Sequence, residues 1–586
     1  MKETKIIPKY FNIIKEARDF IKKDSRKEGN KMIQNPIITG CNPDPSILRV
    51  GDIYYIACSS FEWFPGIPIY KSYDLKNWEL INHAIKRRNQ ADLLGMDSAT
   101  GVWAPALSYN QVTKEFYLTY SIVSGFSNNN FDINNYAIKT DNIEGEWSDA
   151  IYLNSSGFDP SMFQDTDGKS YLVSLEWEFR CGYEHPGCII IQEYDKEDET
   201  LIGNPIQISR GATERGCIEG PHIYKRNGYY YLILAEGGTG YGHCVTISRA
   251  ETIFGPYIPY ENNPILTSQP YDFSERGIGD SSKPYFYNPN SILQKSGHGS
   301  IVETVEGETF IVHLCSRPFP KSKRSVLGRE TAIQKCEWTM DNWIKLTGDN
   351  NLAKLEIEGS NISEQKKTND ISKINSCKDE FIKGVLPVTY YTLRESVNQK
   401  WCFINGDKNL ILIGRNTLFS KYEQSLVAKK VKSFEFEAET CLKLTYPNHL
   451  QMAGLVYYYN NNNFYALRMY YSESLGGIAL GIMKADQGIR YEYREHSILI
   501  DSDAKSVNLH LRVIGEKAQF SFAQIKDEQI ADGEKPYEII GPKLDSSILS
   551  DEYAGGFTGS FVGIFAQDLY QKKKEFEFEY FMYHDK

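Results

Sequence analysis

The chain has 586 residues, more than one hydrophobic core usually supports, so we expect at least two domains. Its 76 acidic side chains outnumber 65 basic ones and give a net charge of −11, which argues against a nucleic-acid partner because phosphates call for a basic face. The mean hydropathy is −0.45 and no long uncharged apolar run occurs, which excludes a membrane-spanning helix and predicts no membrane partner.

The segment before residue 35 differs from the rest of the chain. Within its first 31 residues, apolar side chains recur at helical spacing among many lysines, which predicts an amphipathic basic helix. The segment lacks the apolar core and the cleavage site of a secretion signal, and the 11 cysteines include no Cys-x-x-Cys pair. We therefore expect residues 1–34 to form a helical extension, with a membrane-surface role as the less favoured alternative. The location that this pattern predicts is cytoplasmic, with reduced thiols.

A turn followed by an aromatic strand occurs five times between residues 35 and 345. A second short apolar stretch precedes each of these strands, so every unit has at least two strands joined by a turn. Such units, about 60 residues long, are typical of a propeller with five four-stranded blades. The aromatic anchors of the five units are Tyr55, Tyr117, Tyr171, Tyr231 and Phe310.

The last third of the chain has a different pattern. Residues 346–378 are rich in Ser, Asn, Lys and Glu and are predicted to link two domains. From residue 379 to 586, alternating strands follow without a helical stretch, which predicts a β-sandwich of the jelly-roll or concanavalin type. The predicted fold class is therefore all-β, a five-bladed β-propeller followed by a C-terminal β-sandwich. An aromatic content of 13% and 45 glycines agree with a β-rich chain with many turns.

The repeat also aligns one position in each unit, just before its first strand. Because the innermost strands of a propeller begin around one axis, we expect these five side chains to converge there. Carboxylates that converge repel one another and raise at least one pKa, and a protonated acid beside ionised ones suits acid/base hydrolysis. An inverting glycosidase holds two carboxyl groups about 6.5–9.5 Å apart. Any one of these acids could instead cap a turn. The aligned residues are Asp44, Ala104, Asp159, Glu219 and His298.

Seven ordered motifs in this chain resemble glycoside hydrolase family 43, in particular its two-domain β-xylosidases. The likeness extends over nearly everything from residue 35 and implies a five-bladed propeller that acts with inversion. The motifs are residues 42–47 (NPDPSI), 60–66 (SFEWFPG), 103–105 (WAP), 157–161 (GFDPS), 219–222 (EGPH), 297–299 (GHG) and 327–334 (LGRETAIQ).

The resemblance implies a role for each of the three acids. Asp44 matches the general base that activates water, and Glu219 matches the general acid that protonates the leaving oxygen. Asp159 matches a third acid that orients Glu219 and keeps its pKa high. Arg329 matches an arginine that reaches sugar hydroxyls, and its charge would steady the ionised Asp44.

Further residues of the pocket are implied in the same way. Phe61 and Trp103 match apolar walls on which a sugar face can stack. His298 matches a histidine beneath the site that contacts a divalent ion, often calcium, in some members of the family. Calcium prefers oxygen ligands, so we expect no required cofactor and keep a calcium ion near His298 as the alternative. A loop at residues 557–563 of the sandwich would narrow the pocket.

The activity implied by the resemblance is the release of xylose from the non-reducing end of short β-1,4-xylo-oligosaccharides. An α-L-arabinofuranosidase, or an enzyme with both activities, is the alternative in the same class, because the two sugars present similar hydroxyls. A sugar-binding propeller without turnover is the alternative from another class. Enzymes of this kind are often homo-oligomers, and we expect the same here.

Three stretches need a separate interpretation. Residues 176–187 depart from the β-xylosidase pattern and are expected near the pocket rim. Residues 165–168 begin like a calcium loop but lack its later Glu, so they predict a hairpin turn. Residues 237–240 (GGTG) are glycine-rich but do not lie between a strand and a helix, so they are not interpreted as a nucleotide loop.

Overall fold

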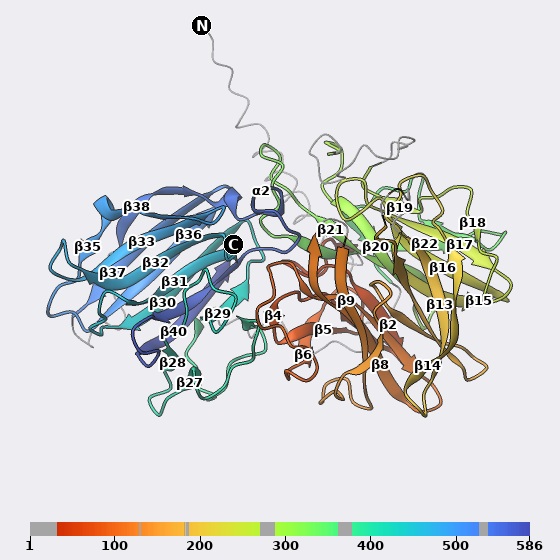
Figure 1. Cartoon of the computed structure of the whole chain (residues 1–586). Coiled ribbons are helices and arrows are strands. Elements are labelled where there is room, and N and C mark those ends of the chain that lie inside the picture. Colours follow the sequence, from red (N-terminus) through yellow and green to blue (C-terminus); the bar gives the residue numbers. More distant parts are fainter. Residues whose placement is uncertain are drawn as a thin grey trace, which may run out of the picture.

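The computed structural model of the chain describes residues 32–127, 130–180, 182, 187–269, 287–360, 378–526 and 537–586. The helix predicted over the first 31 residues lies outside them. The described part consists of strands and turns, with two 3-10 turns, η4 (Arg494–His496) and η5 (Ser546–Ile548), and one short helix, α2 (Asp551–Ala554). None of its helices is long and apolar enough to cross a membrane. Two β domains lie side by side (Figure 1), and the all-β prediction is confirmed.

The first domain is a five-bladed propeller in which every blade is an antiparallel sheet of strands that follow one another in the chain, except that the first blade omits β4 (Trp63–Phe64). In the fourth blade a fifth strand, β19 (Leu266–Thr267), also pairs with β17. The blades are β2 (Ser46–Val50), β3 (Ile53–Ala57), β5 (Gly66–Ser72) and β6 (Glu79–Ile85); β7 (Gly101–Asn110), β8 (Glu115–Ser127), β9 (Asn130–Thr140) and β10 (Ile151–Asn154); β11 (Ser161–Gln164), β12 (Ser170–Trp177), β13 (Gly187–Asp195) and β14 (Thr200–Ser209); β15 (Glu219–Arg226), β16 (Tyr229–Glu236), β17 (Cys244–Ala250) and β18 (Ile258–Pro259); and β20 (Gln294–Glu303), β21 (Thr309–Ser316), β22 (Arg329–Trp338) and β23 (Ile344–Leu346).

The aromatic anchors explain why the blades pack in a ring. Each anchor lies in the second strand of its blade and is buried against the neighbouring blade. Tyr55, for example, meets the ring of Phe116 in the second blade edge-on, with centroids 5.8 Å apart. Phe310 of the fifth blade packs with Ile47 and Ile56 of the first. The five anchors therefore form a closed circle of interblade contacts, and burial of such large rings stabilises the circle.

The N-terminal segment reinforces the closure between the fifth blade and the first. β1 (Met32–Gln34) pairs with β24 (Glu356–Glu358), which follows the propeller in the sequence. The side chain of Asn35 donates to the carbonyl of Ile333 (2.7 Å) and accepts from its amide N–H (2.8 Å). The segment before the first blade is thus bonded to the third strand of the last one.

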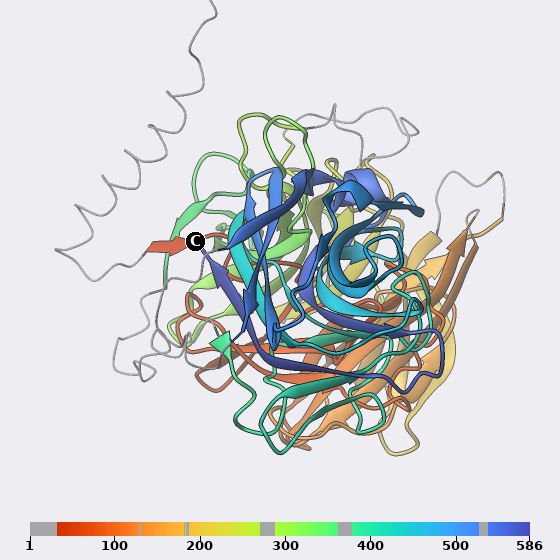
Figure 2. The same cartoon turned by 90° about the vertical axis from the view of Figure 1, so that its left-hand side faces the viewer.

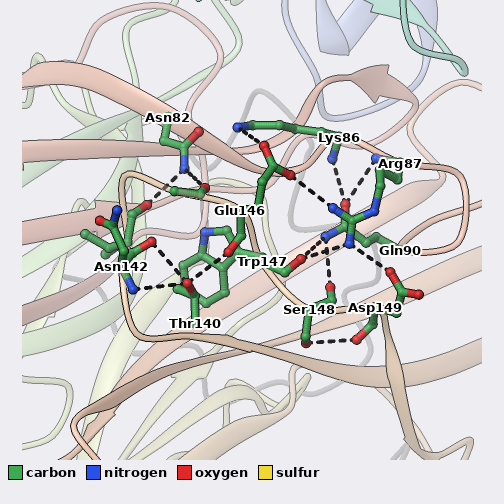
Figure 3. A network of polar contacts seen from close by, with 12 residues as sticks. Asn82, Lys86, Arg87, Gln90, Thr140, Asn142, Glu146, Trp147, Ser148 and Asp149 are labelled. Atoms are coloured by element: carbon green, nitrogen blue, oxygen red, sulfur yellow. Dashed lines mark hydrogen bonds and ion pairs between the residues drawn. The ribbon is translucent and has the colours of Figure 1, made fainter.

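Polar contacts join the first two blades at their outer edge (Figure 3). The buried amide of Gln90 accepts from the backbone of Lys86 and Arg87 and donates to the carbonyls of Trp147 and Ser148. Around it, the guanidinium of Arg87 reaches two acidic side chains of the second blade at 3.0 and 2.8 Å. The ion pairs are half-exposed and contribute little, so the fully bonded amide is the part that fixes this junction.

The second domain is a sandwich of two antiparallel sheets, and the predicted concanavalin-like fold is confirmed (Figure 2). Its core is a continuous cluster of aliphatic and aromatic side chains between the sheets. One sheet has the order β27 (Cys402–Ile404), β28 (Leu410–Ile413), β40 (Glu575–Asp585), β30 (Glu435–Lys443), β36 (Ser506–Ile514), β37 (Lys517–Ile525) and β38 (Glu538–Asp545), with β25 (Lys378–Asp379) on β40. The other has the order β34 (Ile489–Glu492), β33 (Gly477–Asp486), β32 (Asn463–Ser472), β31 (Gln451–Asn460), β39 (Phe561–Asp568), β29 (Ser425–Lys430), β26 (Tyr391–Leu393) and β4 (Trp63–Phe64), with β35 (Ile498–Leu499) on β33.

β4 joins the two domains, although the sequence pattern did not predict this strand. It leaves the first blade between β3 and β5 and pairs with β26 of the sandwich. The indole of Trp63 stacks on the ring of Phe561 at a centroid distance of 3.6 Å. The propeller therefore supplies the edge strand of a sandwich sheet, and the relative position of the domains is fixed by backbone hydrogen bonds as well as by packing.

Candidate active site

Five left-handed residues surround the propeller axis at the start of the innermost strands. φ is 54° at Asp44, 41° at Ala104, 55° at Asp159 and 51° at His298. In the fourth blade the left-handed residue is Gly220, with φ of 57°, so the predicted alignment of Glu219 with the other four is wrong by one residue. The pairing of β15 with β16 shifts register between residues 219 and 222, as that of β7 with β8 does between residues 103 and 106, so Glu219 corresponds to Trp103 and Gly220 to Ala104.

Glycine fits position 220 because the ring of His298 lies against it. A Cβ atom at this position would be 3.0 Å from Cε1 of His298. Glu219 therefore stands one position before the turn and still reaches the same cavity as Asp44 and Asp159. The three predicted acids converge even though one of them comes from a different backbone position.

Hydrogen bonds from neighbouring blades hold two of the acids. Asp44 Oδ2 accepts from the hydroxyl of Ser59 at 2.6 Å, and that hydroxyl oxygen accepts from the amide N–H of Ala104 at 2.7 Å. Asp159 Oδ2 accepts from the amide N–H of Gly220 at 2.9 Å. The bond to Gly220 joins Asp159 directly to the backbone that carries Glu219.

The acids differ in their electrostatic surroundings. Burial raises the pKa of Glu219 to about 8, the charge of Asp44 adds to the rise, and Arg329 opposes it. Burial also raises the pKa of Asp159 well above its ordinary value, as do the charges of Glu219 and Asp44. Asp44 lies beside the charge of Arg329: its Oδ1 is 4.0 Å from Nη1 of Arg329 and 3.7 Å from Nδ1 of His298, whose pKa is lowered by burial. Glu219 is therefore a protonated acid at neutral pH that faces a carboxylate across the cavity.

The cavity has a volume of about 240 Å³ and is enclosed largely by aromatic side chains. The predicted walls Phe61 and Trp103 both line it, and so do His298 and Arg329. An apolar wall opposite a group of acids suits a ring with one apolar face and hydroxyls at its edge. The further aromatic walls are Phe126, Phe131, Phe158, Trp177 and Phe557.

Phe557 reaches this cavity from the sandwich. Its ring lies 5.2 Å from that of Trp103 and 5.6 Å from that of Phe61. Its carbonyl oxygen accepts from Nη2 of Arg329 at 2.5 Å and from Nε at 3.2 Å. The sequence predicts that a loop beginning at residue 557 narrows the pocket; in the structure Phe557 lines the pocket, whereas β39 has already begun by residue 561.

Arg329 is buried and connects three parts of the site. Besides the carbonyl of Phe557, it donates from Nη1 to the hydroxyl of Thr239. Its neighbour Glu330 pairs instead with Arg317 at 2.6 Å, so the two adjacent side chains do not form a surface ion pair with each other. The guanidinium is thus held in the cavity wall, next to Asp44.

Sequence reasoning missed several residues of the wall. Thr239 belongs to the glycine-rich stretch that was set aside because it does not fit a nucleotide loop, yet Thr239 and Gly238 line the cavity. By contrast, residues 176–187 are expected near the pocket rim, and Trp177 of this stretch does line the cavity. Phe126 and Phe131 flank the hairpin between β8 and β9, where aromatic residues at strand ends are the one signal that could have identified them.

The surroundings of His298 do not fit a calcium ion. Among the described residues, no three or more His, Cys, Asp or Glu side chains are grouped so that they could hold a metal ion. Calcium takes six to eight oxygen ligands, whereas the ring of His298 packs on Gly220 and faces a single carboxylate, Asp44. The calcium-like stretch at residues 165–168 forms the turn between β11 and β12, and Asp165 pairs with Lys225 at 2.6 Å.

Gly328 lies where the two domains approach most closely beside the cavity. Its φ is 70°, and a Cβ atom there would lie 1.9 Å from the carbonyl oxygen of Thr558. We expect Gly328→Ala to lower the free energy of unfolding by at least about 2 kcal/mol, because backbone strain and a backbone clash add together. Thermal or denaturant unfolding measures the loss. Gly307→Ala is the control, because φ is 83° there but a Cβ atom would meet nothing within 4 Å; an equal loss in both variants would contradict the clash.

Family models match both domains of the chain. The model described as glycosyl hydrolases family 43 matches residues 33–344, and the model of a β-xylosidase C-terminal concanavalin A-like domain matches residues 378–584. The two matches cover the propeller and the sandwich in turn.

Full-length relatives are similar over almost the whole chain. A protein from a Vibrio species named xylan 1,3-β-xylosidase is 39% identical over 94% of this chain and 99% of its own. A protein from Humicola insolens named xylosidase/arabinosidase 43B is 38% identical over 94% of this chain and 97% of its own. The crystal structure of a xylan β-1,4-xylosidase from Bacillus halodurans superposes with a TM-score of 0.86, at 40% identity over 94% of this chain and all of that one.

Proposed function

Because the chain belongs to glycosyl hydrolases family 43, we propose that it removes xylose from the non-reducing end of short β-1,4-xylo-oligosaccharides with inversion at the anomeric carbon. The protein is a glycoside hydrolase, and its two-domain architecture is that of the β-xylosidases of this family. The observation that carries the proposal is the convergence of three acids on one small aromatic pocket, one of them an acid protonated at neutral pH.

The proposed reaction is a single displacement. Water attacks the anomeric carbon of the terminal xylose from the face opposite the leaving group, and Asp44 accepts the proton that the water loses. Glu219 gives its proton to the glycosidic oxygen as the carbon–oxygen bond breaks, so the products are α-xylose and the oligosaccharide shortened by one sugar. Protons exchanged with solvent then restore the charged Asp44 and the protonated Glu219.

Asp159 and Arg329 have supporting roles in this proposal. The bond between Asp159 and the amide of Gly220 orients the turn next to Glu219. The charge of Asp44 favours the protonated form of Glu219. Arg329 lies near enough to Asp44 to favour its charged form and to donate to sugar hydroxyls. Phe61 and Trp103 supply the apolar face of the subsite.

The shape of the pocket supports removal of one terminal sugar. Phe557 from the second domain closes one side of the cavity, and the acids bound another. A chain that passed through the site would need a long groove, and a pocket of about 240 Å³ with aromatic rings on several sides favours a single terminal sugar instead.

The substrate follows from the names of similar proteins. All three proteins compared above are named as xylosidases. The Vibrio protein is named for a 1,3 linkage and the Bacillus halodurans protein for a 1,4 linkage, and the proposal takes the second. The name of the Humicola insolens protein also includes arabinosidase, which favours α-L-arabinofuranosidase activity as a second candidate.

A proton NMR time course with xylobiose tests the proposal. We expect α-xylose to appear first and β-xylose to follow only as the free sugar equilibrates. Early β-xylose would mean retention and would contradict the roles of Asp44 and Glu219. If xylobiose gives no product while an aryl α-L-arabinofuranoside is hydrolysed, the second candidate function replaces the first.

We also propose a cytoplasmic, homo-oligomeric enzyme. All nine cysteines in the described part of the chain are free thiols, and eight of them are buried, which supports a reducing compartment. Light scattering of the purified protein measures the number of subunits.

A further inference from the structure

A buried ion pair crosses the domain boundary beside the pocket. Lys295 belongs to β20, three residues before His298, and its side chain is only 4% exposed. Its Nζ lies 2.7 Å from Oε1 of Glu552 and 3.9 Å from Oδ2 of Asp551, both in α2 of the sandwich. α2 lies at the boundary between the two domains (Figure 1).

Both acids of α2 have further partners that fix them. Glu552 Oε2 accepts from the amide N–H of Ser325 at 2.7 Å, which is a second bond to the propeller. Asp551 Oδ1 accepts from the hydroxyl of Tyr459 at 2.7 Å. The same hydroxyl oxygen accepts from the amide N–H of Thr558 at 3.4 Å. Residues 551–558, which we call the strap, are therefore bonded at both ends.

The strap carries Phe557 but has little stiffness of its own. Gly555 and Gly556 have φ of 73° and 153°, and glycine at such positions leaves the backbone many conformations. The place of the Phe557 ring therefore depends on the contacts at the two ends of the strap. At one end these are Lys295 and Ser325, and at the other the hydroxyl of Tyr459 and the guanidinium of Arg329.

We propose that Lys295 is a positioning residue that holds the strap through Glu552, so that Phe557 stays in the pocket and the terminal sugar binds tightly. Lys295 does not line the cavity and acts only through the strap. The proposal rests on the proposed function for its substrate, xylobiose, but the position of the strap can be measured without a sugar.

The experiment compares Lys295→Met with the wild type. Met keeps the long apolar stem and removes the charge, so the ion pair is lost with little change in volume. We expect KM for xylobiose to rise at least tenfold while kcat changes less than threefold, because the acids are not displaced. Phe557→Ala should raise KM similarly, and adding Lys295→Met to Phe557→Ala should have no further effect.

Hydrogen exchange provides a readout that does not depend on activity. In Lys295→Met we expect the amides of residues 551–558 to exchange at least tenfold faster, while those of β31 and β39 keep their rates. Glu552→Gln breaks the same pair from the other side and should reproduce both effects. This second variant keeps the test decisive if Lys295→Met does not fold.

Lys335→Met is the matched control. Lys335 also pairs with a glutamate, Glu308, at 2.9 Å in a largely buried setting, but both residues belong to the propeller and lie outside the pocket. It should leave KM and strap exchange unchanged. Unchanged exchange in both Lys295→Met and Glu552→Gln, or a KM effect that simply adds to that of Phe557→Ala, would overturn the proposal. Absence of turnover in the wild type would instead refute the proposed function and leave the exchange result interpretable.

Discussion

Asp44→Asn is expected to lower kcat/KM for xylobiose by about 10²- to 10⁴-fold while xylose still binds. Asn has nearly the same shape and can still accept the hydrogen bond from Ser59 at this position. It cannot take a proton from the attacking water, so the transition state loses its base and the ground state keeps its contacts. Steady-state kinetics and xylose binding by calorimetry measure the two effects separately.

Two further measurements separate loss of a base from loss of structure. Azide attacks without having to lose a proton, so it should restore turnover of an activated aryl xyloside in Asp44→Asn and give an α-xylosyl azide. Ser59→Ala removes one hydrogen bond to Asp44 but keeps the carboxylate, and should lower kcat/KM for xylobiose less than tenfold. If the wild-type protein bound xylose but hydrolysed neither substrate, the non-catalytic alternative would replace the proposed function.

Glu219→Gln should reduce turnover of xylobiose by about 10²- to 10⁴-fold and should affect aryl xylosides with good leaving groups far less. A sugar alkoxide needs a proton in order to leave, whereas a nitrophenolate leaves without one. The ratio of the two losses therefore reports the acid role directly. Equal losses on both substrates would contradict it and would indicate that Glu219 only shapes the pocket.

The raised pKa of Glu219 predicts that activity falls on the alkaline side of the pH profile. Burial and the charge of Asp44 raise the pKa of Glu219 to about 8, and the protonated form is the active one. Activity on xylobiose is therefore present below this pKa and is lost as the pH rises through it. An activated aryl xyloside needs no proton to leave, so on this substrate the alkaline limb should be much weaker in the wild type and absent in Glu219→Gln. If Glu219→Gln lost activity at the same alkaline pH, the alkaline limb would belong to another group.

The sequence repeat carried most of the information about the propeller. The anchors from Tyr55 to Phe310 could be recognised because an interblade contact requires a large ring at the same place in each blade. The convergence of Asp44, Asp159 and Glu219 on one cavity then followed from the symmetry of the fold. The one-residue offset of Glu219 could not be predicted, because the spacing between the left-handed residue and the aromatic anchor differs from blade to blade: Asp44 precedes Tyr55 by 11 residues and Ala104 precedes Tyr117 by 13.

Contacts between distant segments were the part that sequence reasoning could not supply. Phe61 lines the cavity while Trp63 stacks in the sandwich, because the left-handed backbone of Phe61, with φ of 52°, turns the chain before β4 begins. The motif indicates that this stretch belongs to the site, but it does not indicate that one aromatic ring lies in the cavity and the other in the sandwich. Thr239 was missed for a similar reason, because its partner Arg329 lies in the next blade and no local pattern links the two.

The shared strand β4 limits how this architecture can be recombined. The first blade supplies the two residues of β4 to a sandwich sheet, and the sandwich supplies the ring of Phe557 to the pocket. Neither domain is therefore structurally complete without the other. A gene fusion that replaced residues 378–586 alone would bring in a sheet whose edge was shaped for a different strand. An exchange of the sandwich between relatives would therefore have to include residues 61–64 as well.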